Sequence, residues 1–167
     1  DTSLTRSSAP ALTGPRRLVG AAIAGDHALF AGGVNRSGDT TRYYKTVDAY
    51  SASLTRTSVD TMSSGNGYSL KGTTVNKYAL FAEEVRDSRV EAYSPSLTRV
   101  TVSPLSRSSP AYIAATAVGN YAIFSGSSLT ADVYDGSLTK TTASILNRGR
   151  SSMAAVTVGD YALFAGG

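Results

Sequence analysis

Ala28–Gly33 reads Ala-Leu-Phe-Ala-Gly-Gly, and this 167-residue chain contains the stretch four times. The other copies are ALFAEE at 79–84, AIFSGS at 122–127 and ALFAGG at 162–167. All four phenylalanines of the protein lie in these copies. Similar segments that return every 40 to 51 residues are typical of propellers and solenoids, in which each repeat is one small structural unit. This repeat therefore decides the fold.

Two further markers recur in the same order as the first. The motif Ser-Leu-Thr-Arg or Ser-Leu-Thr-Lys begins at residues 3, 53, 96 and 137. A Val-Asp-Ala-Tyr type of segment lies at 47–50, 90–93 and 131–134. The markers divide a single domain, 1–167, into units at about 1–50, 51–93, 94–134 and 135–167.

The last unit shows the first two strands of a repeat. The apolar run Met153–Val158 predicts a buried strand, and Gly159-Asp160 is a pair typical of a two-residue hairpin turn. Tyr161–Ala165 is the expected second strand. The same turn position holds favourable pairs in two other units, and only Asn76-Lys77 departs from them.

The remaining two strands of each unit follow from the other markers. In the Val-Asp-Ala-Tyr segments, alternation places the acidic residue and the tyrosine on one face of a third strand. The β-branched stretches at 54–59 and 97–102 predict fourth strands. No stretch sustains a helical period of 3.6 residues, so we expect an all-β protein with almost no helix.

Four-stranded units of this length predict the blades of a β-propeller, stacked face to face around an axis. Small side chains suit the innermost strand because the blades converge there. The alanine-rich runs at 21–24 and 114–117 fit that position. The expected architecture is about four blades, the last of them incomplete.

The order of the markers resembles that of kelch repeats, over essentially the whole chain. Gly32-Gly33 and Gly166-Gly167 resemble the double glycine of that family, and Tyr50, Tyr93 and Tyr134 resemble its tyrosine. Two double glycines are replaced, by Glu83-Glu84 and Gly126-Ser127, and the family's tryptophan is absent. The resemblance implies a β-propeller that binds proteins or glycans. A minority of such propellers, similar to galactose oxidase, are enzymes.

The strands expected at the two ends of the sequence do not add up to one complete blade, as closure of a simple ring would require. The chain opens with an expected fourth strand, Ser3–Ser7, and closes after an expected second strand. Ser3–Ser7 could complete the last blade from outside, but a third strand would still be missing. Three outcomes follow: a ring with one three-stranded blade, a fragment of a longer parent chain, or an open piece that pairs with another copy. Open strand edges favour association, so a homo-oligomer or a longer chain is expected.

Composition excludes several classes of function. The net charge of +4 is mild and its basic residues are spread along the chain, which argues against a nucleic-acid partner. No apolar run approaches 18 residues, so no membrane span is expected. The absence of cysteine excludes disulfides and thiolate metal sites, and it leaves the cellular compartment open. No cofactor or metal site is expected.

The insertion at 34–45 is the strongest candidate for a binding site. It makes the first repeat interval the longest, and its basic and aromatic residues are Arg36, Arg42, Tyr43, Tyr44 and Lys45. Loops on a rigid scaffold commonly carry binding, and Tyr and Arg are frequent interface anchors. The alternative is a solvated loop without a role. The charged segment 83–89 occupies the equivalent place in the next unit and could share its rim.

Other polar residues have simpler explanations. His27, the only histidine, replaces a tyrosine of the other units and lacks ligand partners in the repeats. The repeated acids are expected to pair with a basic residue on the adjacent strand. The expected pairs are Asp48 with Arg56, Glu91 with Arg99, and Asp132 with Lys140. Asn35-Arg36-Ser37 is a formal glycosylation sequon, which is meaningful only in a secreted eukaryotic protein.

The sequence favours a non-enzymatic kelch-like scaffold that binds a protein or carbohydrate partner through its rim loops, with no catalytic residues. One alternative is a natural or engineered propeller fragment that completes a ring from several copies. Another is a glycan-acting enzyme on a propeller scaffold, which would require non-repeated polar residues at the central axis.

Overall fold

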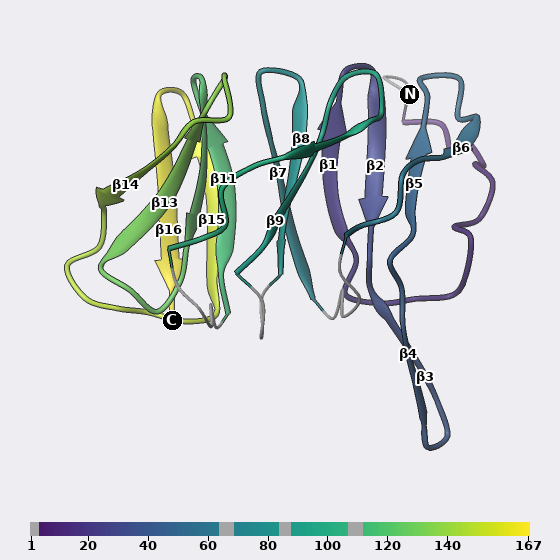
Figure 1. Ribbon diagram of the computed structural model, residues 1–167, viewed down its shortest axis with the longest axis horizontal. Coiled ribbons are helices and arrows are strands. Elements are labelled where there is room, and N and C mark those ends of the chain that lie inside the picture. The colour runs from purple at the N-terminus through teal and green to yellow at the C-terminus, as the bar shows by residue number, and fades with distance from the viewer. Residues whose placement is uncertain (1–3, 64–68, 84–87, 107–111) are drawn as a thin grey trace.

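The computed structural model describes residues 4–63, 69–83, 88–106 and 112–167. Within these ranges the chain forms sixteen strands in antiparallel sheets and no helix (Figure 1). The expectation of an all-β protein is confirmed. The same ranges accordingly hold no helix with the length and apolar character needed to cross a membrane.

Three four-stranded sheets and a two-stranded sheet follow one another along the chain. The first consists of β1 (Gly20–Ala24), β2 (His27–Ala31), β5 (Val47–Tyr50) and β6 (Arg56–Ser58). The second consists of β7 (Leu70–Val75), β8 (Tyr78–Glu83), β9 (Val90–Tyr93) and β10 (Arg99–Thr101). The third consists of β11 (Ala114–Val118), β12 (Tyr121–Ser125), β13 (Thr130–Asp135) and β14 (Lys140–Ser144). The fourth pairs β15 (Met153–Val158) with β16 (Tyr161–Gly166).

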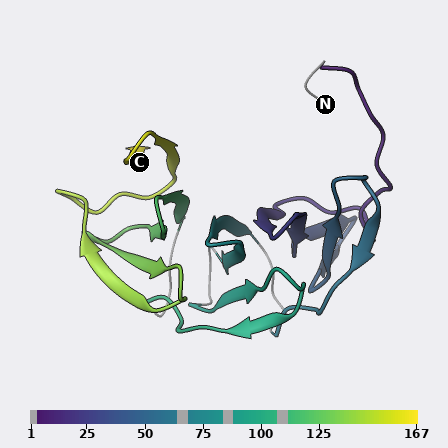
Figure 2. The ribbon, with the colours of Figure 1, turned by 90° about the horizontal axis from the view of Figure 1, so that it is seen from above.

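The sheets lie side by side in an open arc (Figure 2). Their first strands β1, β7, β11 and β15 are successive neighbours and line the inner side of this arc. The alanine-rich runs at 21–24 and 114–117 fall on β1 and β11, as expected for the innermost position. The arrangement is compatible with a propeller-like fold, although the described residues do not form a closed ring.

The repeated motif fills the junctions between the first and second sheets and between the second and third. Along a strand, side chains alternate between the two faces, so the leucine and phenylalanine of the motif point to opposite neighbours. Leu29 of the first sheet and Phe81 of the second lie in one buried cluster. Leu80 of the second sheet and Phe124 of the third lie in another. The cores therefore sit between sheets, not within them.

The innermost strands approach each other very closely at Gly72 in β7. A Cβ atom at this position would lie 2.2 Å from the carbonyl oxygen of Ala21 in β1. Beside it, Thr74 Oγ1 accepts a 2.8 Å hydrogen bond from the Ile23 amide and donates one of 3.1 Å to its carbonyl oxygen. A glycine and a threonine thus join two strands that belong to different sheets.

In each of the first three sheets, the third strand holds the segment that leads into that sheet. The carboxylates of Asp48, Glu91 and Asp132 accept hydrogen bonds from the backbone and hydroxyl groups of Thr13, Ser63 and Ser106 respectively. The hydroxyls of Tyr50, Tyr93 and Tyr134 donate to the carbonyls of Pro10, Asp60 and Ser103, at 2.8, 3.1 and 2.7 Å. The acid and the tyrosine share one face, as the alternation predicts, and together they hold one incoming segment.

The expected fourth strands begin later than the sequence suggests. β6 and β10 start at Arg56 and Arg99, whereas Leu54 and Leu97 lie in the preceding turn with φ of 60° and 64°. The Leu54 amide donates to the Ser51 carbonyl in this turn, and the Leu97 amide does the same to Ser94. The prediction of strands from Leu54 and Leu97 is wrong because each leucine takes a left-handed turn conformation.

Two other expectations about local structure are corrected. Ser3–Ser7 was expected to be a strand, but residues 4–7 form none, and Leu4 is 94 % exposed. Residue 3 lies outside the described residues. Asn76-Lys77 does form the tight turn between β7 and β8, with both residues at positive φ, although its sequence departs from the other turn pairs.

Candidate binding site

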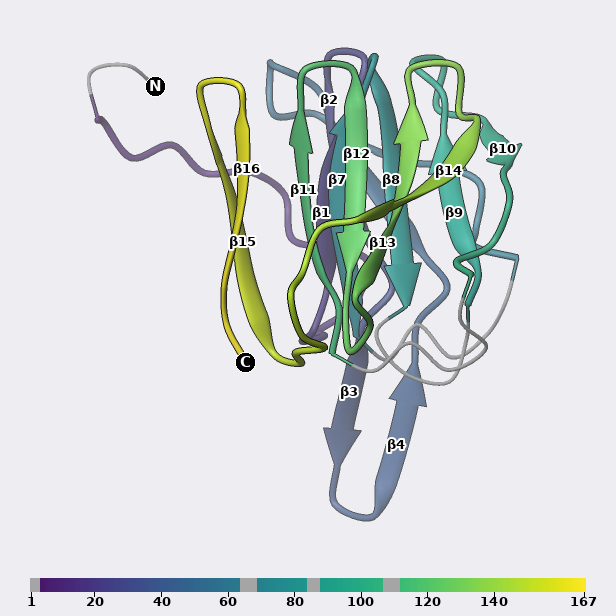
Figure 3. The ribbon, with the colours of Figure 1, turned by 90° about the vertical axis from the view of Figure 1, so that its left-hand side faces the viewer.

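The insertion at 34–45 contains an ordered hairpin. β3 (Val34–Ser37) pairs with β4 (Thr40–Tyr43), and Gly38 in the turn has a φ of 57°. The hairpin branches from the first sheet between β2 and β5 and projects beyond the ends of the strands (Figures 1 and 3). Most of its side chains are exposed.

The root of the hairpin is tied to the segment before β1. Arg17 and Val34 exchange two backbone hydrogen bonds of 2.9 Å, and the Tyr44 amide donates to the Gly33 carbonyl at 2.9 Å. Gly33 has a φ of 100°, and a Cβ atom there would lie 2.7 Å from the Arg17 carbonyl oxygen. The glycine therefore permits the close approach that fixes the direction of the hairpin.

Arg16 and Asp48 form a fully buried ion pair beneath the hairpin. Arg16 Nη2 lies 2.7 Å from Asp48 Oδ2, and Arg16 Nη1 donates to Thr46 Oγ1 at 2.8 Å. Burial acts to raise the pKa of Asp48, but the hydrogen bonds from Thr13 and the charge of Arg16 outweigh it and hold that pKa below its usual value. The charge of Arg16 is compensated, so this arginine supports the site without offering a free cation.

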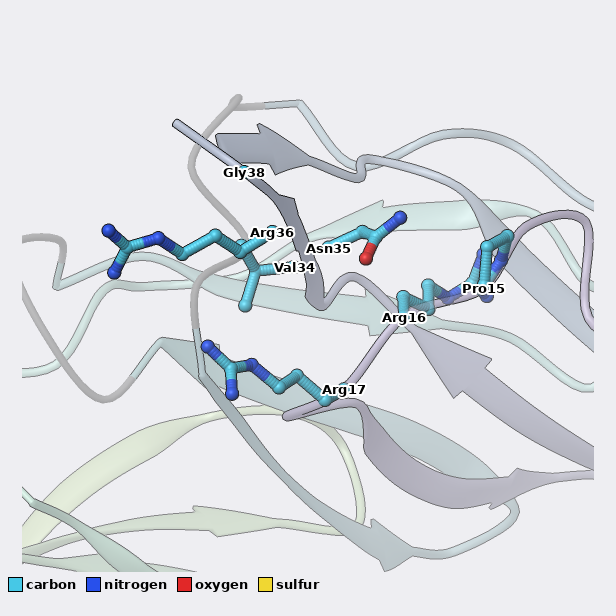
Figure 4. A pocket seen from close by; sticks show the side chains of 7 residues that line it. All are labelled: Pro15, Arg16, Arg17, Val34, Asn35, Arg36 and Gly38. Atoms are coloured by element: carbon cyan, nitrogen blue, oxygen red, sulfur yellow. The ribbon is translucent and has the colours of Figure 1, made fainter. Parts of the chain in front are cut away.

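A pocket of about 460 Å³ opens at the root of the hairpin. It is lined by Pro15, Arg16, Arg17, Val34, Asn35, Arg36 and Gly38. The side chains of Arg17 and Arg36 extend in the same direction on either side of Val34 (Figure 4). Neither guanidinium forms an ion pair or a side-chain hydrogen bond with any residue that the structure describes. The pocket therefore presents two positive charges that no described residue compensates, on either side of the buried Val34.

The five residues expected to bind a partner have different environments. Arg36 lines the pocket, whereas the Arg42 guanidinium lies 5.1 Å from the centre of the Tyr44 ring. Tyr43 and Lys45 are exposed, but Tyr44 is buried beside Gly14 and Arg16. Tyr44 thus has a structural role at the base of the hairpin, while the other four residues remain accessible.

Sequence reasoning did not find Arg17. This residue is 19 positions away from Arg36 in the chain, and only the backbone pairing between Arg17 and Val34 brings the two together. The adjacent Arg16-Arg17 pair just before the first strand was the available signal. It did not indicate that one arginine is buried and the other exposed.

The other polar candidates occupy structural positions. The expected ion pairs between acidic and basic residues of adjacent strands are confirmed. The separations are 4.0 Å for Asp48–Arg56, 3.9 Å for Glu91–Arg99 and 3.4 Å for Asp132–Lys140. His27 begins β2 and is half-buried. Residues 84–87 of the charged segment 83–89 lie outside the described residues. Among the residues that are described, no group of three or more His, Asp or Glu side chains could hold a metal ion.

No family model and no curated protein sequence matches the chain. Many solved structures resemble its fold, among them those of YjhT and of a designed protein. The structure of YjhT matches with a TM-score of 0.70 and 13% identity, over 92% of this chain and 59% of YjhT. The crystal structure of the computationally designed Ika4 protein matches with a TM-score of 0.61 and 13% identity, over 96% of this chain and 92% of Ika4. The chain thus spans about three fifths of YjhT, and at this identity the likeness shows the fold alone.

Proposed function

We propose that this chain is a non-enzymatic, kelch-like propeller scaffold that binds a protein or carbohydrate partner through the β3–β4 hairpin. The order of the repeated motifs and the arc of four-stranded sheets support the propeller assignment. The observation that carries the binding role is the pair of uncompensated guanidiniums, Arg17 and Arg36, on either side of Val34 in one pocket.

The partner group that fits this pocket is an anion. An arginine side chain presents a planar fork of donors that matches carboxylate, sulfate or phosphate oxygens. Val34 between the two cations is buried and holds the strand in place, and Asn35 adds an amide beside them. The exposed Tyr43 and Arg42 extend the contact area along the hairpin, because aromatic and arginine side chains are common anchors in interfaces. An acidic peptide and an acidic glycan both offer this chemistry.

The test is the binding of defined anionic probes to Arg17→Ala/Arg36→Ala. A heparin-derived oligosaccharide and a poly-glutamate peptide represent the two partner classes, and a neutral oligosaccharide and a neutral peptide serve as comparisons. We expect the wild-type chain to bind one anionic probe, with an affinity that falls as salt is added. We expect the double variant to lose at least tenfold in affinity.

The matched control is Arg6→Ala/Arg148→Ala, which removes the same charge from two exposed residues outside the pocket. Equal losses in the two double variants would mean that net charge alone drives binding, and the pocket assignment would fail. Wild-type protein that binds neither anionic probe would also contradict it. No observation on the described residues favours the alternative of a glycan-acting enzyme.

A further inference from the structure

The first and last sheets each leave one apolar face uncovered. Cross-strand pairing places a set of small and apolar residues on one face of β1–β2, here called the head face: Ala21, Ile23, Ala28 and Phe30. Pairing in the last hairpin defines an opposite set, here called the tail face: Ala154, Val156, Val158, Tyr161, Leu163 and Ala165. Ile23 is 53 % exposed, Val156 59 % and Leu163 47 %.

The junctions inside the molecule show that these two kinds of face fit each other. The residues equivalent to Leu163 are Leu29, Leu80 and Ile123, and those equivalent to Phe30 are Phe81, Phe124 and Phe164. Leu29 packs in one cluster with Phe81, and Leu80 in the next with Phe124. At these two junctions, a tail-type face of one sheet therefore covers a head-type face of the following sheet.

The innermost positions of the two uncovered faces are unusually apolar. At the junction of the third and fourth sheets, Thr116 Oγ1 lies 2.8 Å from Thr157 Oγ1. Repeat alignment makes Thr116 equivalent to Val156 on the tail face, and Thr157 equivalent to Ile23 on the head face. Two threonines that share a hydrogen bond inside the molecule are thus replaced, at its two ends, by two β-branched apolar residues.

We propose that the tail face of one copy packs against the head face of a second copy, with Val156 against Ile23 and Leu163 against Phe30. The substitution of apolar for polar residues occurs on both faces at matching positions, which favours pairing between copies of the same chain. These side chains are at least partly exposed in the single chain, so burying them between two copies would favour association. This inference is independent of the binding pocket.

The surroundings of both faces leave room for such a contact. The outer part of the head side of the first sheet is already covered by the chain's own segment 10–13, held by Asp48 and Tyr50. Segment 60–63 covers the second sheet in the same way, next to the preceding sheet. Both uncovered faces border the open side of the arc (Figure 2). A head-to-tail contact repeated twice can therefore close two arcs into a ring with no face left open.

The test is the molar mass of the 167-residue chain in solution at micromolar concentration, measured by light scattering after size exclusion. We expect a species of twice the 17.3 kDa of one chain. Leu163→Glu on the tail face and Ile23→Glu on the head face should each give a monomer. Leu129→Glu is the matched control, because Leu129 is 50 % exposed on the third sheet's rim and should leave the dimer intact.

Mixing the two blocked variants tests the direction of the contact. Ile23→Glu leaves the tail face unchanged, and Leu163→Glu leaves the head face unchanged. In the mixture these two faces can pair, so a heterodimer should form although neither variant dimerises alone. A dimer that persists in Ile23→Glu alone would overturn the head-to-tail contact, since it would require two tail faces to meet. A monomeric wild-type chain would overturn the proposal entirely. Circular dichroism verifies folding, and Val156→Asp replaces Leu163→Glu if that variant does not fold.

Discussion

Leu80 and Leu163 occupy the same place in two copies of one motif, yet the first is fully buried and the second is 47 % exposed. Both lie on the second strand of a hairpin with nearly the same sequence. The difference is the neighbour. β8 has a third strand beside it and another sheet in front of Leu80, whereas in the described chain β16 has no third strand and no sheet in front of Leu163. A repeat of this kind specifies a strand, but the adjacent unit determines its burial.

The largest effect in this comparison is expected at the phenylalanines. Phe81 is fully buried between two sheets, so Phe81→Ala should cost about 3–5 kcal/mol of unfolding free energy. Phe164 is only partly buried against the third sheet, and Phe164→Ala should cost less than half as much. Chemical denaturation of both variants measures the difference. Equal losses would mean that the last hairpin is as well packed as the inner sheets.

The next effect concerns the third strand, which the fourth sheet lacks. Asp48→Ala leaves Arg16 buried without its partner and should cost about 3 kcal/mol. Asp132→Ala should cost less, because the charge of Lys140 is partly exposed and stays hydrated when its partner is removed. Denaturation at neutral pH compares the two variants. A larger loss in Asp132→Ala would contradict the assignment of Asp48 as the most tightly held acid.

The same carboxylate predicts a pH dependence. Because folding lowers the pKa of Asp48, its contribution is present above the unfolded pKa of about 4 and is lost as pH falls through the lower folded value. Wild-type stability should therefore decline below about pH 4 more steeply than that of Asp48→Asn. Parallel acid-denaturation curves for the two proteins would argue against this contribution.

A smaller effect is expected where the last hairpin meets the third sheet. Thr157 Oγ1 donates to the Ala117 carbonyl and shares a hydrogen bond with Thr116. Thr157→Val should cost about 1–2 kcal/mol, since both hydrogen bonds are lost at similar side-chain volume. Thr141→Val, on the exposed outer strand β14, is the control and should change stability by less than about 0.5 kcal/mol. Equal effects would mean that the inner threonine contact contributes nothing.

The turn leucines give the smallest effect. Leu54 has a φ of 60°, a conformation that costs a leucine about 1–2 kcal/mol, and it is only partly covered. Asparagine tolerates this conformation, so Leu54→Asn should be neutral or stabilising by up to about 1 kcal/mol. Leu97→Asn should destabilise, because Leu97 packs against the first buried cluster. Melting temperatures distinguish the two results.

The sequence predicted the repeated architecture well because its signals are local. The position of each hairpin turn, the inner alanine-rich strands and the incomplete last unit follow from residues that are neighbours in the chain. The ion pairs were also predictable, since their acidic and basic residues lie on adjacent strands of one sheet. The kelch resemblance stays a prediction.

The failures arise where conformation or long-range contact decides. A leucine at positive φ carries no signal of its own, so Leu54 and Leu97 were assigned to strands. The burial of Tyr44 and the presence of Arg17 in the pocket depend on pairing between segments 15–17 and 34–44. In the sequence, the strands β1 and β2 separate these two segments, and no pattern in either segment indicates that they pair.

The central claim is that the neighbouring strands and sheets, and not the motif itself, determine how firmly each copy is held. Hydrogen exchange measured by mass spectrometry on peptides covering β12 and β16 tests it directly. We predict slow exchange in β12, which lies between two strands, and much faster exchange in β16, which pairs with β15 alone. Equal protection of the two strands would contradict the account.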